Sequence, residues 1–175
     1  MKTNKYLLKI SVFLVCLLLL TVSAEAQRKR TTKKTTTTTT TNTTTTTTAE
    51  IKDGANKVSI QIKNLTKFLY LLGTIAQGIE DIDKDTKAPQ AAIDKNTKNK
   101  QAVITTIRNL RAGLAALEIE FRTKPALKTY NLQIEGISAL CGQSEDLAVG
   151  GKFLESGKPL LLVVEKLSDT LVAMP

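Results

Sequence analysis

The sequence predicts an all-α protein: an antiparallel, up-down-up-down four-helix bundle preceded by a disordered threonine-rich segment. Apolar residues recur in alternating steps of four and three over most of residues 51–174, as they do along one face of a helix. Glycine, proline and acidic residues interrupt this pattern, and most of the connections are short, which favours antiparallel neighbours. No segment shows the sustained apolar–polar alternation between turn dipeptides that predicts strands.

Residues 1–26 have the three-part pattern of a secretory signal peptide. Basic residues precede an uncharged apolar run at residues 10–22, and small residues follow, with Ala26 as the last residue removed. A helix of that length spans about 20 Å, against about 30 Å for a bilayer core, so we expect no permanent transmembrane anchor. An uncleaved anchor is the alternative, because positive charge just beyond the cleavage site opposes translocation. The expected location is extracytoplasmic: periplasm, cell surface or secreted.

Residues 27–48 are predicted to form a disordered, basic, low-complexity tether. Threonine occupies 15 of the 18 positions in residues 31–48, and no apolar side chain offsets the entropic cost of ordering this segment. Five bases and no acid lie in the tether, and we call them the basic cluster: Arg28, Lys29, Arg30, Lys33 and Lys34. Residues 49–175, the predicted bundle domain, carry 17 bases and 15 acids. The basic cluster is therefore the candidate site for polyanions, and a plain solvated spacer is the alternative.

The first helix is predicted to run from Ile51 to the acidic residues at 80–85, which oppose the dipole at a helix C-terminus. Its apolar face consists of Ile51, Ala55, Val58, Ile62, Leu65, Leu69, Leu72, Ala76 and Ile79. Phe68, Leu71 and Ile75 widen this face, as in a helix that packs on more than one neighbour. The width favours an intramolecular bundle, and so a monomer, over a two-stranded coiled coil.

Pro89 suits the first turn of the second helix. Its apolar face consists of Val103, Ile107, Leu110, Leu114, Leu117 and Phe121. Traced backwards, the same face meets Lys100 and Asn96, so the first turns are expected to be solvated. Part of the surface is basic, through Lys95, Lys98, Lys100, Arg108 and Arg111. No aromatic residue interleaves these bases, which favours a solvated face over a single-strand nucleic-acid site.

Pro125 marks the third helix, and Gly150 with Gly151 ends it. The third apolar face consists of Leu127, Tyr130, Ile134, Ile137 and Cys141. A second interruption at residues 156–159 is predicted to precede the fourth helix, with Leu160, Val164, Leu167, Leu171 and Met174 on its apolar face. Four glycines inside the predicted helices are expected to permit close helix contact or to mark kinks: Gly73, Gly78, Gly113 and Gly136.

The chain has no histidine, which excludes Ser-His-Asp and Cys-His catalysis and any imidazole-ligated metal. Asp81, Asp83 and Asp85 have the spacing of the first ligands of a calcium loop. Thr86 and Ala92 then stand where that loop needs glycine and a bidentate glutamate, so a solvated acidic loop is favoured. We predict no catalytic, cofactor-binding or metal-binding residue.

Cys141 is the one cysteine that remains after the predicted cleavage, so no intrachain disulfide can form. Its position on an apolar face predicts a buried structural thiol. The alternative is an intermolecular disulfide, and so a Cys141-linked dimer, in an oxidising compartment.

Together, these features favour an exported, non-catalytic helical protein that acts as a binding or structural module on a flexible basic tether. A second hypothesis is non-specific binding of anionic polysaccharide, lipid or nucleic acid through the basic cluster. A third is an enzyme that uses carboxylates and lysines alone, which a deep pocket with two facing carboxylates would support. The partners expected are cell-envelope polyanions or another envelope protein.

Overall fold

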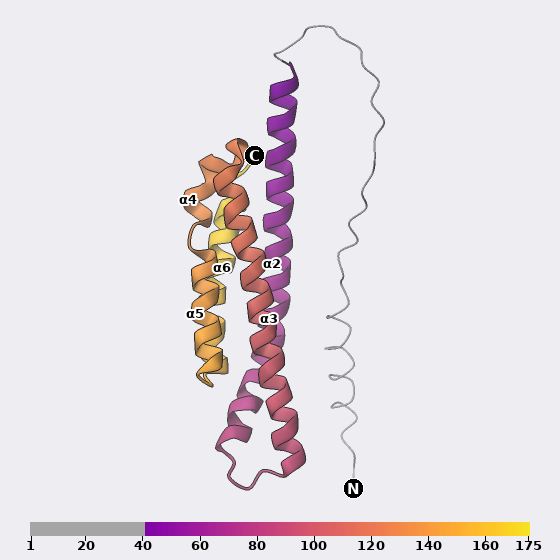
Figure 1. Cartoon of the computed structure of the whole chain (residues 1–175), viewed down its shortest axis with the longest axis vertical. Helices are drawn as coiled ribbons and strands as arrows, with labels where there is room; N and C mark the ends of the chain where they lie inside the picture. Colours follow the sequence, from indigo (N-terminus) through magenta and orange to yellow (C-terminus); the bar gives the residue numbers. More distant parts are fainter. Residues whose placement is uncertain (1–40) are drawn as a thin grey trace, which may run out of the picture. The chain divides into compact units, whose positions relative to one another are not determined.

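The computed structural model describes residues 41–175, and within that range the chain forms helices and no strand (Figure 1). In chain order the elements are α2 (Thr41–Lys84), α3 (Gln90–Thr123), the 3-10 helix η2 (Pro125–Tyr130), α4 (Asn131–Ile134), α5 (Ile137–Val149) and α6 (Phe153–Ala173). The all-α bundle is confirmed. The predicted signal peptide, the basic cluster and the rest of residues 1–40 lie outside the described residues.

The four longer helices pack so that each contacts two others (Figure 1). Helix α2 packs against α3 and α6, and α5 packs against the same two helices. In the first half of α2, Lys57 donates a hydrogen bond to Glu120 near the end of α3. Near the end of α2, the Ile79 carbonyl accepts a hydrogen bond from Asn96 near the start of α3, so these two helices run antiparallel. No helix within residues 41–175 has an apolar stretch long enough to cross a membrane.

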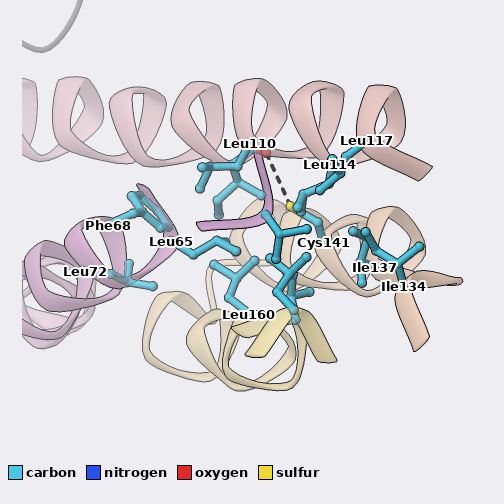
Figure 2. Packing of buried hydrophobic residues seen from close by; sticks show 14 of the residues in the cluster. Leu65, Phe68, Leu72, Leu110, Leu114, Leu117, Ile134, Ile137, Cys141 and Leu160 are labelled. Atoms are coloured by element: carbon cyan, nitrogen blue, oxygen red, sulfur yellow. Dashed lines mark hydrogen bonds between the residues drawn. The ribbon is translucent and has the colours of Figure 1, made fainter. Parts of the chain in front are cut away.

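The core is built from the apolar faces that the sequence defines. All six residues predicted for the face of α3 are buried. Figure 2 shows Leu65 and Phe68 of α2, Leu110 and Leu114 of α3, and Leu160 of α6 meeting in one apolar cluster. On α2, Ile51, Ala55, Ile62 and Leu69 lie half-buried at the margin of this cluster. Leu71, which was expected to widen the apolar face of α2, is 37% exposed.

Helix α2 begins at Thr41, eight residues before the predicted start of the bundle domain. The last part of the predicted disordered tether is thus helical, and the side chains of Thr46, Thr47 and Thr48 are exposed. Adding a residue to an existing helix costs far less than nucleating one, so the packed part of α2 can extend through β-branched threonines. The other end of α2, at Lys84, lies within the acidic segment that was predicted to end it.

The first turns of α3 are mostly exposed, as expected, but Asn96 is an exception. Asn96 is 2% exposed, and its Nδ2 donates hydrogen bonds to the Ile79 carbonyl at 3.0 Å and to Asp83 Oδ1 at 2.9 Å. Lys100 is half-buried, with its Nζ 2.5 Å from Asp83 Oδ1. Asn96 and Lys100 occupy positions in register with the apolar face because the end of α2 supplies hydrogen-bond and ion-pair partners for them, the Ile79 carbonyl and Asp83.

The third predicted helix is three short helices, and Gly136 separates the last two. Its φ of 85° lies in the left-handed region that glycine adopts at little cost, so this glycine marks a kink. Beyond the kink, the Glu118 carboxylate of α3 accepts hydrogen bonds from the backbone N–H and the hydroxyl of Ser138. A side chain of one helix thereby caps the free N-terminus of α5.

Helix α6 begins at Phe153 and continues through Pro159, so the predicted break at residues 156–159 is wrong. Pro159 removes one hydrogen bond near the start of the helix. Burial of Phe153 and Pro159 offsets that loss, and Glu80 of α2 accepts the free backbone N–H of Leu154 at 2.9 Å. The contact from Glu80 comes from another part of the fold.

The glycine that allows the closest helix contact is Gly54, which was not among the four singled out. A Cβ at this position would lie 2.8 Å from Cδ2 of Leu127 in η2. By contrast, a Cβ at Gly73 or Gly78 would meet nothing within 4 Å. At Gly113 it would come within 3.1 Å of the Gln61 side chain, a close contact of the kind expected there.

Candidate functional site

The basic face predicted for α3 is largely paired with acids. Arg108 Nε lies 2.6 Å from Glu145 Oε1 of α5, and Arg111 Nη1 lies 3.2 Å from Glu145 Oε2. The hydrogen bond from Arg108 is the main reason why the pKa of Glu145 is lowered. With Lys100 on Asp83, three of the five predicted bases are in ion pairs, while Lys95 and Lys98 are exposed.

A second group of charges, which we call the Lys57–Glu120 network, consists of Asp53, Lys57, Glu120 and Lys124. Lys57 Nζ lies 2.8 Å from Asp53 and 2.6 Å from Glu120, and Lys124 pairs with the same two acids. The hydrogen bond from Lys57 lowers the pKa of Asp53. Burial opposes ionisation of Glu120, but hydrogen bonds from Lys124 and Lys57 outweigh it and lower its pKa. With two acids and two bases in mutual contact, the network joins α2 to α3 and is balanced in charge.

Cys141 is buried, as predicted, and its thiol donates a hydrogen bond to the Ile107 carbonyl at 3.5 Å (Figure 2). Burial raises the pKa of this thiol to about 12, against a weaker opposing effect of Arg111. The thiolate is the reactive form, so the folded protein holds Cys141 in its unreactive state at neutral pH. A disulfide with a second copy would require this side chain to leave the core.

Two adjacent hollows lie where α2 ends. The first, which we call the α2–α3 hollow, has a volume of about 180 Å³ and is lined by Ile82, Asp83, Asp85, Ile93, Asn96, Thr97 and Lys100. The second, of about 250 Å³, is lined by Glu80, Asp83, Lys84, Gly151, Lys152 and Glu155. Asp83 belongs to both, so the two hollows meet at the end of α2.

Asn96 has a fixed orientation in the wall of the α2–α3 hollow. Both partners of its Nδ2, the Ile79 carbonyl and Asp83 Oδ1, are acceptors, so the amide cannot be turned around without losing two hydrogen bonds. The amide oxygen is consequently directed away from them. It is buried, and no donor within residues 41–175 reaches it. Because this oxygen is shielded from solvent, a ligand in the hollow does not reach it unless the wall rearranges.

The three acids that have the spacing of a calcium loop each contact a different partner. Asp81 accepts from Gln77 at 2.7 Å, Asp83 pairs with Lys100, and Asp85 accepts from the Lys87 backbone N–H at 2.9 Å. Within residues 41–175, no group of three or more Cys, Asp or Glu side chains is arranged to hold a metal ion.

The α2–α3 hollow was missed at the level of sequence, although one signal pointed to it. Asn96 is in register with the apolar face of α3, and a polar residue at a core position is informative because burying it requires partners. No protein-family model, curated protein or solved structure matches the chain.

Proposed function

We propose that the protein is an exported, non-catalytic helical module that binds a ligand or partner and is carried on a basic, threonine-rich segment. The observation that supports binding is the α2–α3 hollow, a depression of about 180 Å³ that is lined by both charged and apolar side chains. Export is supported by the signal-peptide pattern of residues 1–26.

Export is tested by the intact mass of the protein recovered outside the cytoplasm. We expect the mass of a chain that begins at Gln27, because small residues precede that position as a signal peptidase requires. A full-length chain held in the membrane fraction would contradict cleavage and favour an uncleaved anchor.

A second candidate function is binding of polyanions through the basic cluster, and the distribution of charge favours this surface over the bundle. Five of the 17 bases of the bundle domain lie in ion pairs with acids: Lys57, Lys100, Arg108, Arg111 and Lys124. The tether has five bases and no acid in 22 residues. Five bases that engage a duplex would give log K a slope of roughly −4 to −5 against log salt concentration.

The test is salt elution of the chain from Gln27 onward on immobilised heparin. One variant replaces the five residues of the basic cluster with glutamine. The matched control replaces five exposed lysines of the bundle with glutamine and has the same net charge: Lys63, Lys67, Lys95, Lys98 and Lys128. We expect the first variant to elute at low salt and the control to elute close to the wild type. Equal losses in both variants would show that net charge, rather than the basic cluster, governs retention.

A further inference from the structure

We propose that the outward side of α6 binds a second copy of this chain, with the two α6 helices antiparallel and related by a two-fold axis that passes between Leu161 and Leu162. This surface is separate from the α2–α3 hollow and from the basic cluster, so the dimer goes beyond the proposed function. The monomer expected from the sequence corresponds to the single bundle, and the dimer joins two such bundles, each with its own closed core.

The outward side of α6, which we call the α6 outer side, is rich in exposed apolar side chains. At 3.6 residues per turn, it lies opposite the buried Leu160 and Leu167. Four large apolar residues on it are about half exposed or more: Leu154, Leu161, Leu162 and Val172. The charged residues between them are exposed as well: Lys158, Glu165 and Asp169. Helix α6 packs on α2, α4 and α5 with its other side, so the α6 outer side is left open.

The charges on the α6 outer side are complementary to a second copy of themselves. Lys158 and Glu165 are seven residues apart, about 10 Å along the helix axis, and their midpoint coincides with the midpoint between Leu161 and Leu162. In an antiparallel pair, a two-fold axis through this point brings Lys158 of each copy opposite the partner's Glu165. The same axis brings Leu161 opposite the partner's Leu162. Two identical ion pairs thus flank an apolar centre.

The bundle itself does not use these two charges. Lys158 and Glu165 belong to none of the ion pairs within residues 41–175, whereas Lys57, Arg108 and Lys124 each contact an acid. Ion pairs at the rim of an interface add little affinity, but they fix its register and disfavour wrong arrangements. A parallel pair of α6 helices would bring Lys158 against the partner's Lys158, so the charges select the antiparallel arrangement.

A second copy is favoured over a membrane surface, because Glu165 and Asp169 on the α6 outer side would be pressed against lipid headgroups. The dimer is expected to be weak, since one helix from each copy supplies the contact and a standard interface buries about 1,600 Å² in total. Farther from the axis, Leu154 lies opposite the partner's Asp169, which confines the favourable contacts to the region around Leu161 and Leu162.

The experiment is sedimentation equilibrium of the chain from Gln27 onward at low salt. A reducing agent is present, so that a dimer linked through Cys141 does not contribute. We expect a monomer–dimer equilibrium over protein concentrations from about 0.01 to about 1 mM, with a dissociation constant of about 0.1 mM. Raised salt should weaken the dimer, because its ion pairs are close to solvent.

Charge reversal tests the register of the two helices. Lys158→Glu and Glu165→Lys each place like charges opposite one another at two symmetric sites, so each variant alone should dimerise at least about tenfold more weakly. An equimolar mixture of the two variants should recover the affinity of the wild type, because both ion pairs re-form between unlike chains. The matched control is Lys98→Glu, which makes the same change of charge at an exposed residue of α3. It should dimerise like the wild type.

Truncation tests the apolar centre. Leu162→Ala removes apolar contact at both symmetric sites and should weaken the dimer about tenfold. Leu132→Ala, at an exposed leucine of α4, is the matched control and should have no effect. All of the substituted side chains are exposed, so the variants should fold, and circular dichroism checks this for each.

Three results would overturn the proposal: a monomer at every concentration, a dimer that Lys158→Glu and Leu162→Ala leave unchanged, or a mixture of the two charge variants that dimerises no better than either alone. The last result, with a wild-type dimer still present, would exclude the antiparallel register. Recovery of the dimer in the mixture, but not in the separate variants, would support it. The heparin experiment compares variants of the basic cluster and is interpreted independently of these outcomes.

Discussion

The Lys57–Glu120 network and the α2–α3 hollow lie toward opposite ends of α2 and use similar side chains, acids and lysines at the contact with α3. In the network, each of two lysines lies beside both acids, and the charges balance. The lining of the hollow contains one lysine, which pairs with Asp83, and a second acid, Asp85, while the buried amide oxygen of Asn96 has no donor within residues 41–175. The network is therefore balanced in charge, whereas the lining of the hollow keeps one excess negative charge.

Leu114→Ala measures how much a core side chain contributes to stability, for comparison with substitutions at the Lys57–Glu120 network and at the α2–α3 hollow. Leu114 is fully buried between them, so we expect a loss of about 2–5 kcal/mol in the free energy of unfolding. Urea unfolding followed by circular dichroism measures this loss, with Leu71→Ala as the partly exposed control. A loss below about 1 kcal/mol would mean that the core is not packed as described.

Gly54→Ala tests the packing beside the network. The new methyl group would lie 2.8 Å from Leu127, so we expect a destabilisation of about 1–3 kcal/mol despite the better helix propensity of alanine. Gly78→Ala is the matched control, because a Cβ there meets nothing within 4 Å, and it should stabilise by up to about 1 kcal/mol. If both substitutions stabilise, α2 is not held against η2 at Gly54.

Lys57→Met tests the network directly through pH. The lowered pKa values of Asp53 and Glu120 contribute stability above the pKa values of the unfolded chain, and this stability is lost as pH falls through the folded values. The wild type should therefore lose more stability between pH 6 and pH 3 than Lys57→Met does. The difference should be below about 1 kcal/mol, since these groups are partly exposed.

Lys100→Met is the counterpart at the hollow. Its ion pair with Asp83 is about one-third exposed on both sides, so we expect a smaller effect on stability, a few tenths of a kcal/mol. Thermal unfolding of Lys57→Met and Lys100→Met at pH 6 and pH 3 compares the stability contributed at the two ends of α2. A larger effect at Lys100 than at Lys57 would show that the ion pair at the hollow, rather than the Lys57–Glu120 network, contributes more to holding α2 against α3.

The sequence was sufficient for the class of fold and for most of the core. Because 3.6 residues per turn decide which side chains share a helix face, spacing alone identified all six buried apolar residues of α3. Composition identified the uneven charge between the basic cluster and the bundle domain. The burial of Cys141 was predicted from the same periodicity, because this residue lies one turn from Ile137 on the apolar face of α5.

Only the tertiary structure decided where α6 begins, which glycine is crowded and where an acceptor is left unsatisfied. At the start of α6, Glu80 accepts the backbone N–H of Leu154 from 74 residues away. Gly54 is crowded by Leu127, and Asn96 is buried because the end of α2 receives its amide hydrogens. Each of these outcomes depends on a contact between residues far apart in the chain, and local periodicity carries no information about which distant side chain will arrive there.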